Sequence, residues 1–171
     1  MSVRFDVKDA ALRESFLRGE FLERLAALEE GTPARWGGMT PQQMVEHLEW
    51  VFAISNGRER VECPVPAAER ERVKPFLRSN MPTPRGFENP VLTQGLPPLR
   101  HATLDAARAA LRSEVGRFFA AAASEPAAPR THPLFGPLDA EDWSRAHYKH
   151  AHHHLLQFGL IEEPERPPRR A

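Results

Sequence analysis

The sequence of 171 residues predicts an all-α fold, an antiparallel bundle of four helices with one long crossover connection. Four segments carry apolar residues at the spacing of an amphipathic helix, and no segment alternates apolar and polar residues convincingly enough for a strand. A proline-rich stretch over 57–102 separates the second helix from the third. We expect a single domain over 1–161 and a disordered, charged tail over 162–171.

Two helices are predicted in the first third of the chain. The first covers about 9–28, with Asp9 as its N-cap and Gly19 as a point where it divides into two pieces. The second covers 40–55 and begins with Thr40, a proline and a glutamine three residues after the threonine, which together form a capping box. An Asn-Gly pair ends this second helix.

The stretch over 57–102 is predicted as a long loop that covers a pocket. Its prolines leave room for one short helix at about 69–79, interrupted at Pro75. A loop of this length inside a compact domain is often functional. The connector at 32–39, with glycines at 37 and 38, is predicted to allow a tight approach to the next element.

Two further helices are predicted in the C-terminal half. The third covers 103–124 and is closed by prolines. After a proline and glycine turn at 132–137, Asp139 caps the fourth helix, which runs to about Ile161.

The composition excludes several classes of function. Lys plus Arg and Asp plus Glu number 23 each, so we expect no nucleic-acid partner and no polybasic membrane anchor. No apolar run is long enough to span a membrane, and the N-terminus is unlike a signal peptide, so we expect a cytoplasmic protein. The single cysteine, Cys63, lies in a polar loop and is expected to be an inert thiol.

Five of the eight histidines fall within 147–154, on the fourth predicted helix. On a helical wheel His150 and His154 share the apolar face and can point two imidazoles at a single ion. His152 lies about 160° away and is expected to face water. For the remaining histidines a surface or hydrogen-bonded role is favoured, with His132 also able to enter a pocket from its turn: His147, His153, His101 and His132.

The second helix offers a third imidazole. His47 lies on the apolar arc of that helix, whereas Glu46 and Glu49 lie well off it. His47, His150 and His154 therefore form a candidate triad of neutral nitrogen donors, which suits a divalent ion, zinc or nickel first, and copper or iron as well. A lone inward histidine is more often a core residue than a ligand, so the pattern alone leaves both readings open.

Two other groups of residues bear on this site. Gln157, one turn beyond His154, is a candidate to orient a ligand or a substrate. The tryptophans are expected to form core and pocket wall: Trp36, Trp50 and Trp143.

The motifs together resemble a known family. The segments Trp36-Gly37-Gly38-Met39-Thr40-Pro41-Gln42-Gln43-Met44, His132-Pro133-Leu134-Phe135-Gly136 and His150 to Gly159 look like the DinB-like superfamily of metal-dependent proteins, in a branch of unknown function. The resemblance implies a four-helix bundle whose divalent metal is held by three histidines, which match His47, His150 and His154. The spacing of Gln157 is kept, but Leu155-Leu156 replaces the family's usual arginine and glycine.

Two functional hypotheses follow. In the first, the protein is an enzyme, since some relatives resemble thiol transferases and one group isomerises maleylpyruvate with mycothiol. A metal with an open position would then activate water or a small thiol against a small-molecule substrate, with no side chain assigned as general base. In the second, the bundle is non-catalytic, and a structural metal or a histidine cluster joins two helices. A weaker idea is a protein-binding module, and a homodimer is compatible with a bundle.

Overall fold

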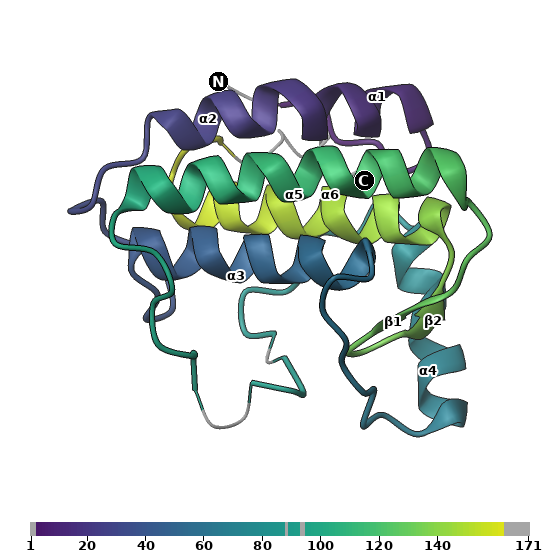
Figure 1. Cartoon of the computed structure of the whole chain (residues 1–171). Coiled ribbons are helices and arrows are strands. Elements are labelled where there is room, and N and C mark those ends of the chain that lie inside the picture. Colours follow the sequence, from purple (N-terminus) through teal and green to yellow (C-terminus); the bar gives the residue numbers. More distant parts are fainter. Residues whose placement is uncertain (1–2, 88, 93–94, 163–171) are drawn as a thin grey trace, which may run out of the picture.

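The computed structural model describes residues 3–87, 89–92 and 95–162, and the described chain is mainly helical, as predicted (Figure 1). The predicted disordered tail lies outside the described residues from 163 onward. The helical elements are α1 (Ala10–Ser15), a π-helical segment (Phe16–Glu20), α2 (Phe21–Ala26), α3 (Pro41–Ser55), α4 (Ala67–Val73), a 3-10 segment (Lys74–Arg78), α5 (Leu104–Ser124) and α6 (Ala140–Gln157).

The first predicted helix forms one helical stretch, from α1 through the π-helical segment into α2. The side chain of Asp9 accepts a hydrogen bond from the Leu12 N–H at 3.0 Å and so caps α1 as predicted. Gly19 lies within the π-helical segment, and the backbone stays helical on both sides of it. The predicted division at Gly19 is therefore a change of hydrogen-bond pattern, of the kind that occurs as a single π turn inside α-helices.

Helix α3 has the capping box that the sequence predicts. The Thr40 hydroxyl accepts from the Gln43 N–H at 3.2 Å, and the Gln43 carboxamide oxygen accepts from the Thr40 N–H at 2.9 Å. The helix ends at Ser55, and Gly57 follows with a φ of 85°. Both predicted ends are confirmed.

The later helices also follow local signals. Thr103 caps α5 by accepting from the Ala106 N–H at 3.1 Å, and Asp139 caps α6 by accepting from the Asp142 N–H at 2.8 Å. Helix α6 ends at Gln157, earlier than the predicted end near Ile161. The chain leaves the helix through a glycine at 159 with a φ of 69°.

The expectation of a chain without strands is wrong at one place. Strands β1 (Arg130–His132) and β2 (Gly136–Leu138) pair antiparallel, with His132 opposite Gly136. Each strand has three residues, too few to produce a visible alternation of apolar and polar side chains. The predicted proline and glycine turn is the loop of this hairpin.

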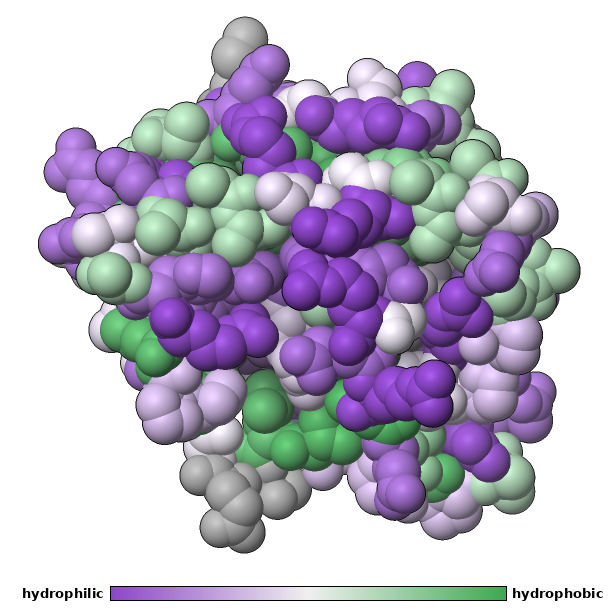
Figure 2. Space-filling view, in the orientation of Figure 1, coloured by the Kyte–Doolittle hydropathy of each residue, from purple (hydrophilic) through white to green (hydrophobic). Residues whose placement is uncertain are grey.

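Helix α3 packs against both α5 and α6, and the long connection around α4 lies to one side of these helices (Figure 1). No helix within the described ranges is long and apolar enough to cross a membrane. Figure 2 shows a largely hydrophilic face, with apolar groups gathered beside the loop between α4 and α5. The largest core side chains include Phe21, Phe52, Phe118, Trp143 and Tyr148.

Candidate metal centre

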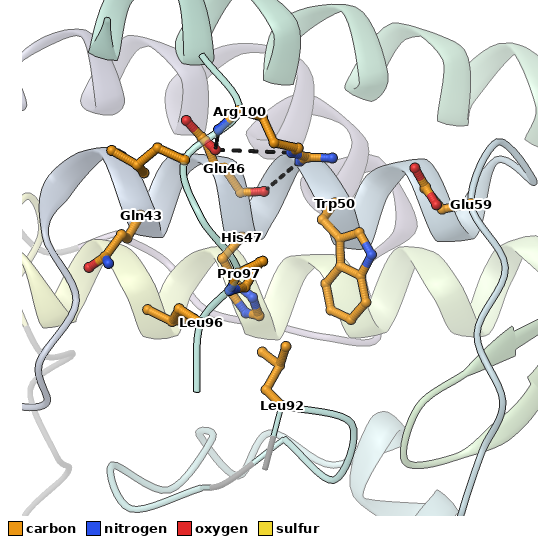
Figure 3. A pocket seen from close by; sticks show the side chains of 10 residues that line it. Gln43, Glu46, His47, Trp50, Glu59, Leu92, Leu96, Pro97 and Arg100 are labelled. Carbon is orange, nitrogen blue, oxygen red and sulfur yellow. Dashed lines mark hydrogen bonds and ion pairs between the residues drawn. The ribbon is translucent and has the colours of Figure 1, made fainter. Parts of the chain in front are cut away.

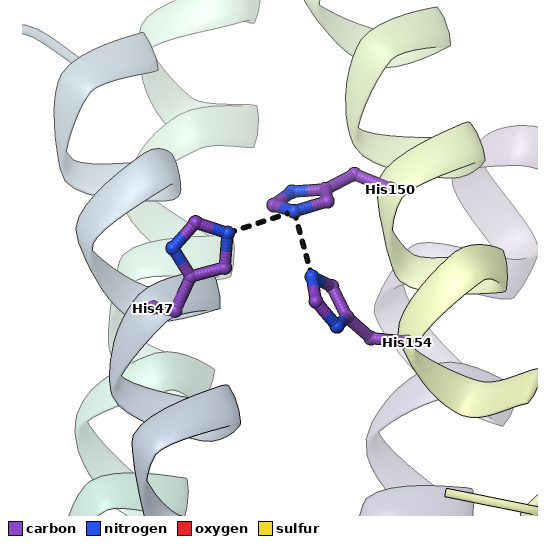
Figure 4. Close-up of side chains that lie close together, drawn as sticks. All are labelled: His47, His150 and His154. Carbon is purple, nitrogen blue, oxygen red and sulfur yellow. Dashed lines mark hydrogen bonds between the residues drawn. The ribbon is translucent and has the colours of Figure 1, made fainter. Parts of the chain in front are cut away.

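Two helices far apart in the sequence, α3 and α6, bring three imidazoles to one point (Figure 4). The Nε2 atom of His150 lies 3.0 Å from Nε2 of His47 and 2.9 Å from Nε2 of His154. Four residues make about one helical turn, so His150 and His154 leave α6 from the same face. Within the described part of the chain, these three residues form a group whose donor atoms all lie within 4.8 Å of one another. The structure thus brings together the three histidines of the predicted triad.

The tautomer of His154 is set by Gln157. Nδ1 of His154 lies 2.7 Å from Oε1 of Gln157, and this nitrogen carries the hydrogen because a carboxamide oxygen can only accept. The amide is oriented in turn by its Nε2 group, which donates to the carbonyl oxygen of Trp36 at 2.9 Å. Nε2 of His154 therefore presents a lone pair to the other two imidazoles.

The glycine connector before α3 allows this arrangement. The Arg35 N–H donates to the Gln157 carbonyl at 2.7 Å, which docks the connector on the C-terminal end of α6. Gly37 has a φ of 75°, and a Cβ there would lie 3.0 Å from Nε2 of Gln157. A Cβ on Gly38 would meet nothing within 4 Å. A close approach therefore occurs at Gly37 only, and it is an approach to Gln157 at the end of α6, not to the next helix as predicted.

Burial keeps the three imidazoles neutral. It lowers the pKa of His47 to about 4, with a smaller effect from His153, and it lowers the pKa of His150 and of His154 well below the usual 6.5. The neighbouring imidazoles lower the pKa of His150 and of His154 further, because two adjacent positive charges repel each other. Neutral imidazole is the form that binds a metal ion.

The contacts inside the triad cannot all be ordinary hydrogen bonds. A neutral imidazole has one N–H and one lone pair, so the Nε2 atom of His150 either donates or accepts. If it carries a hydrogen, that single hydrogen must serve both His47 and His154. If it does not, its lone pair faces the lone pair of His154 across 2.9 Å. A cation among the three atoms would meet a lone pair from each ring, so the residues present fit a metal ion.

The expectation that His152 faces water is wrong. Only 4 % of this residue is exposed, and its ring contacts the rings of Phe5, Phe16 and Tyr148 at centroid distances of 4.7, 4.9 and 5.2 Å. The face of α6 opposite the triad is covered by the N-terminal segment and the first helical stretch. The helical wheel placed His152 on the correct face of α6, but it could not show that other segments of the chain pack on that face.

Two histidines that flank the triad also contact residues outside it. His147 is buried and stacks on Phe52 at a centroid distance of 3.7 Å, and its Nε2 lies 2.7 Å from the Ser55 hydroxyl. His153 is half-buried and meets the Trp36 ring edge-on at 5.6 Å. Neither His147 nor His153 belongs to the group of three histidines whose nitrogen atoms converge.

The two remaining histidines are hydrogen-bonded, in line with the reading that the sequence favours for them. His101 Nε2 lies 2.8 Å from a carboxylate oxygen of Glu49, and Nδ1 of His132 accepts from the Leu134 N–H at 3.0 Å. His132 therefore braces the hairpin loop and is not one of the residues that line the pocket beside His47.

A pocket of about 240 Å³ lies beside His47, between α3 and the loop that leads to α5 (Figure 3). Trp50 forms one wall of it, as the sequence predicts, while Trp143 is a core residue whose Nε1 donates to the Arg130 carbonyl at 3.0 Å. The residues that line the pocket are Gln43, Glu46, His47, Trp50, Glu59, Leu92, Leu96, Pro97, Leu99 and Arg100.

Lys149, next to His150 in the sequence, has a role that the sequence does not predict. Its ammonium group is buried over the Phe76 ring and donates to the backbone carbonyls of Ser79 and Met81. Burial lowers the pKa of Lys149 to about 8. A lysine on a polar helix is normally solvated, so only the tertiary structure shows that it fastens the loop after the 3-10 segment to α6.

The chain matches no family model, no curated protein and no solved structure. The resemblance to the DinB-like superfamily therefore rests on the motifs of the sequence, and a function for the triad must be argued from its geometry and chemistry.

Proposed function

We propose that the protein is a metal-dependent enzyme with the four-helix bundle of the DinB-like superfamily, and that His47, His150 and His154 hold one divalent ion, zinc or nickel. The observation that carries this proposal is the convergence of three neutral Nε2 atoms, with the lone pair of His154 directed inward by Gln157. Three protein ligands with no fourth are typical of catalytic zinc sites, whereas structural sites are closed by four.

The donor set supports an ion that keeps a position for a small molecule. No carboxylate within the described ranges joins the three imidazoles. Glu46 and Glu49, the acidic residues nearest in sequence to His47, instead bind the Arg100 and His101 region. When bound, the ion would lower the pKa of a coordinated water or small thiol and so supply a nucleophile at neutral pH.

The protein's own groups have separate roles in this proposal. Gln157 fixes the orientation of His154, and the pocket beside His47 admits a small substrate next to the centre. Lys149 holds the loop at Ser79 and Met81 against α6, on the helix that carries two of the ligands. No side chain is assigned as a general base.

The alternative is a non-catalytic protein in which the ion joins α3 and α6. The neutral, buried imidazoles would suit this role equally well, since a structural ion also needs deprotonated ligands. The two functions differ in the coordination sphere, because a structural site has its fourth position filled by a protein side chain.

The test is the metal content of protein purified without an affinity tag. We expect about one zinc or nickel ion per chain. His154→Ala should abolish stoichiometric binding, while His153→Ala, on the same helix but outside the triad, should retain it. Full occupancy of His154→Ala by elemental analysis would rule out the triad.

The coordination sphere decides between the two functions. We expect X-ray absorption of the loaded protein to give three imidazoles plus a light exchangeable ligand. Added thiol should replace that ligand with sulfur. A fourth protein ligand that thiol does not displace would favour the structural role.

A further inference from the structure

The pocket beside His47 is lined mainly by apolar side chains from α3 and from the loop that precedes α5 (Figure 3). Leu92 and Leu96 are half-buried, and Leu99 is half exposed, so these side chains present apolar surface that the core does not use. The apolar lining consists of Trp50, Leu92, Leu96, Pro97 and Leu99.

Two polar side chains of the lining, Gln43 and Glu46, already accept hydrogen bonds from other parts of the protein. The carboxamide oxygen of Gln43 accepts from the backbone at the start of α3. The Glu46 carboxylate accepts from the N–H groups of Arg100 and His101 at 2.7 and 3.1 Å. The two hydrogen bonds to Glu46 also hold the loop that forms one wall of the pocket against α3. The Gln43 oxygen and the Glu46 carboxylate are therefore already engaged within the protein.

The charges around the pocket disfavour an anionic ligand. The guanidinium of Arg100, which could attract an anion, lies 3.2 Å from the Glu49 carboxylate. The Glu59 carboxylate lines the pocket and forms no ion pair with any residue that the structure describes. The negative charges thus offset or exceed the positive charge at this surface.

We propose that this pocket binds the uncharged, apolar body of a small molecule, an aryl or branched alkyl group, whose donor atom reaches the three histidines. This inference rests on the proposed metal-dependent function and names the substrate class of that site. The volume of about 240 Å³ is below the roughly 300–1,000 Å³ of pockets for drug-sized ligands, so the bound group is about the size of one substituted ring. The Trp50 ring offers it a stacking surface.

The experiment uses (4-fluorophenyl)methanethiol as the probe and ¹⁹F NMR as the readout, with metal-free and zinc-loaded full-length protein. We expect the probe signal to shift and broaden with both proteins. Binding should be at least about tenfold tighter with zinc, because the sulfur then also binds the ion. Phenylmethanethiol should displace the probe, and cysteine at the same concentration should not.

Leu96→Asp tests the pocket, and Phe87→Asp is the matched control. Phe87 lies in the same connection and is 45 % exposed, but it does not line the pocket. We expect Leu96→Asp to weaken probe binding at least about tenfold in the metal-free protein and Phe87→Asp to leave it unchanged. Zinc content should be the same in both variants.

Each result decides one of the two proposals. Probe binding that is lost in Leu96→Asp but occurs in a protein that takes up neither zinc nor nickel would support the pocket and refute the metal-dependent function. Three other results would refute the proposal of an apolar ligand but not the metal site. The first is zinc uptake without probe binding. The others are displacement of the probe by cysteine as well as by phenylmethanethiol, and equal effects of the two substitutions.

Discussion

The Nδ1–H of His154 donates to Oε1 of Gln157 across 2.7 Å, and this hydrogen bond determines which nitrogen of the imidazole faces His47 and His150. Gln157 can hold this orientation because its own amide donates to the Trp36 carbonyl at 2.9 Å. A loop before α3 therefore controls the chemistry of a side chain on α6. Partners of this kind raise the basicity of a ligating histidine and restrict its rotation.

Replacement of Gln157 should weaken metal binding more than it weakens the fold. We expect Gln157→Leu to lower zinc affinity about 10–100-fold, because the His154 ring loses its fixed tautomer and orientation. Gln157→Glu should lose less, since a carboxylate still accepts from Nδ1 but cannot donate to Trp36. Competition with a chromogenic chelator measures both affinities. Equal affinity of Gln157→Leu and the parent protein would contradict this role.

Gly37→Ala should disturb the same chain of hydrogen bonds, from Trp36 through Gln157 to His154, because the substitution strains the backbone next to it. The added Cβ would lie 3.0 Å from the Gln157 amide, at a residue whose φ is 75°. We expect a loss of more than about 1 kcal/mol in the free energy of unfolding, together with weaker zinc binding. Gly38→Ala is the control and should stay within about 0.5 kcal/mol of the parent protein in urea unfolding. Equal losses for the two variants would show that Gly37 has no special role.

Zinc affinity should change little over the pH range in which a site made of exposed histidines would lose its affinity for zinc. The pKa of His47 is lowered to about 4, and those of His150 and His154 lie well below 6.5. Protons therefore compete with the ion only as the pH falls toward 4, and not as it passes through 6.5. Titrations between pH 8 and about 5.5 would check this. A fall in affinity centred near pH 6.5 would mean that the free imidazoles are not desolvated.

His132 should make the folded state less stable in acid. Burial lowers its pKa to about 3 in the folded protein, whereas the unfolded chain has the usual value near 6.5. The unfolded state thus binds more protons below pH 6.5, so the free energy of unfolding is highest above that pH and falls as the pH drops toward about 3. In His132→Asn the slope of this fall, measured by urea unfolding, should be smaller. An unchanged slope would refute the link.

His152→Phe should stabilise the protein. Nε2 of His152 is buried and has no hydrogen-bond partner in the described structure, while the ring lies among Phe5, Phe16 and Tyr148. Replacing an unsatisfied polar atom with an aromatic ring should raise the free energy of unfolding by about 1 kcal/mol. Thermal unfolding of the metal-free protein measures this effect. A clear loss of stability would show that His152 has a partner or that the larger ring does not fit.

Much of the fold and of the triad could be predicted because the signals are local. The caps at Asp9, Thr40 and Asp139 depend on a few neighbouring residues, and the structure confirms all three predictions. The inward faces of α3 and α6 follow from helical periodicity, which put His47, His150 and His154 on facing surfaces. That these three bind a metal stays a prediction.

Other features could not be read from the sequence because they depend on distant segments. The strands around the turn at 133–135 are too short to show a period and form only by pairing with each other. Lys149 is buried because the loop at Ser79 and Met81 folds over it. The same residue types would be solvated in an isolated helix.

The sequence by itself determined the helices, their caps and the face on which each histidine lies, since backbone propensity and helical period act within a few turns. Only the tertiary structure decided what packs on those faces. It placed Phe5 and Phe16 over His152, and it placed the Trp36 carbonyl where it orients Gln157 and so His154. The burial of a side chain and the tautomer of an imidazole are set by atoms from remote parts of the chain, which a local pattern does not contain.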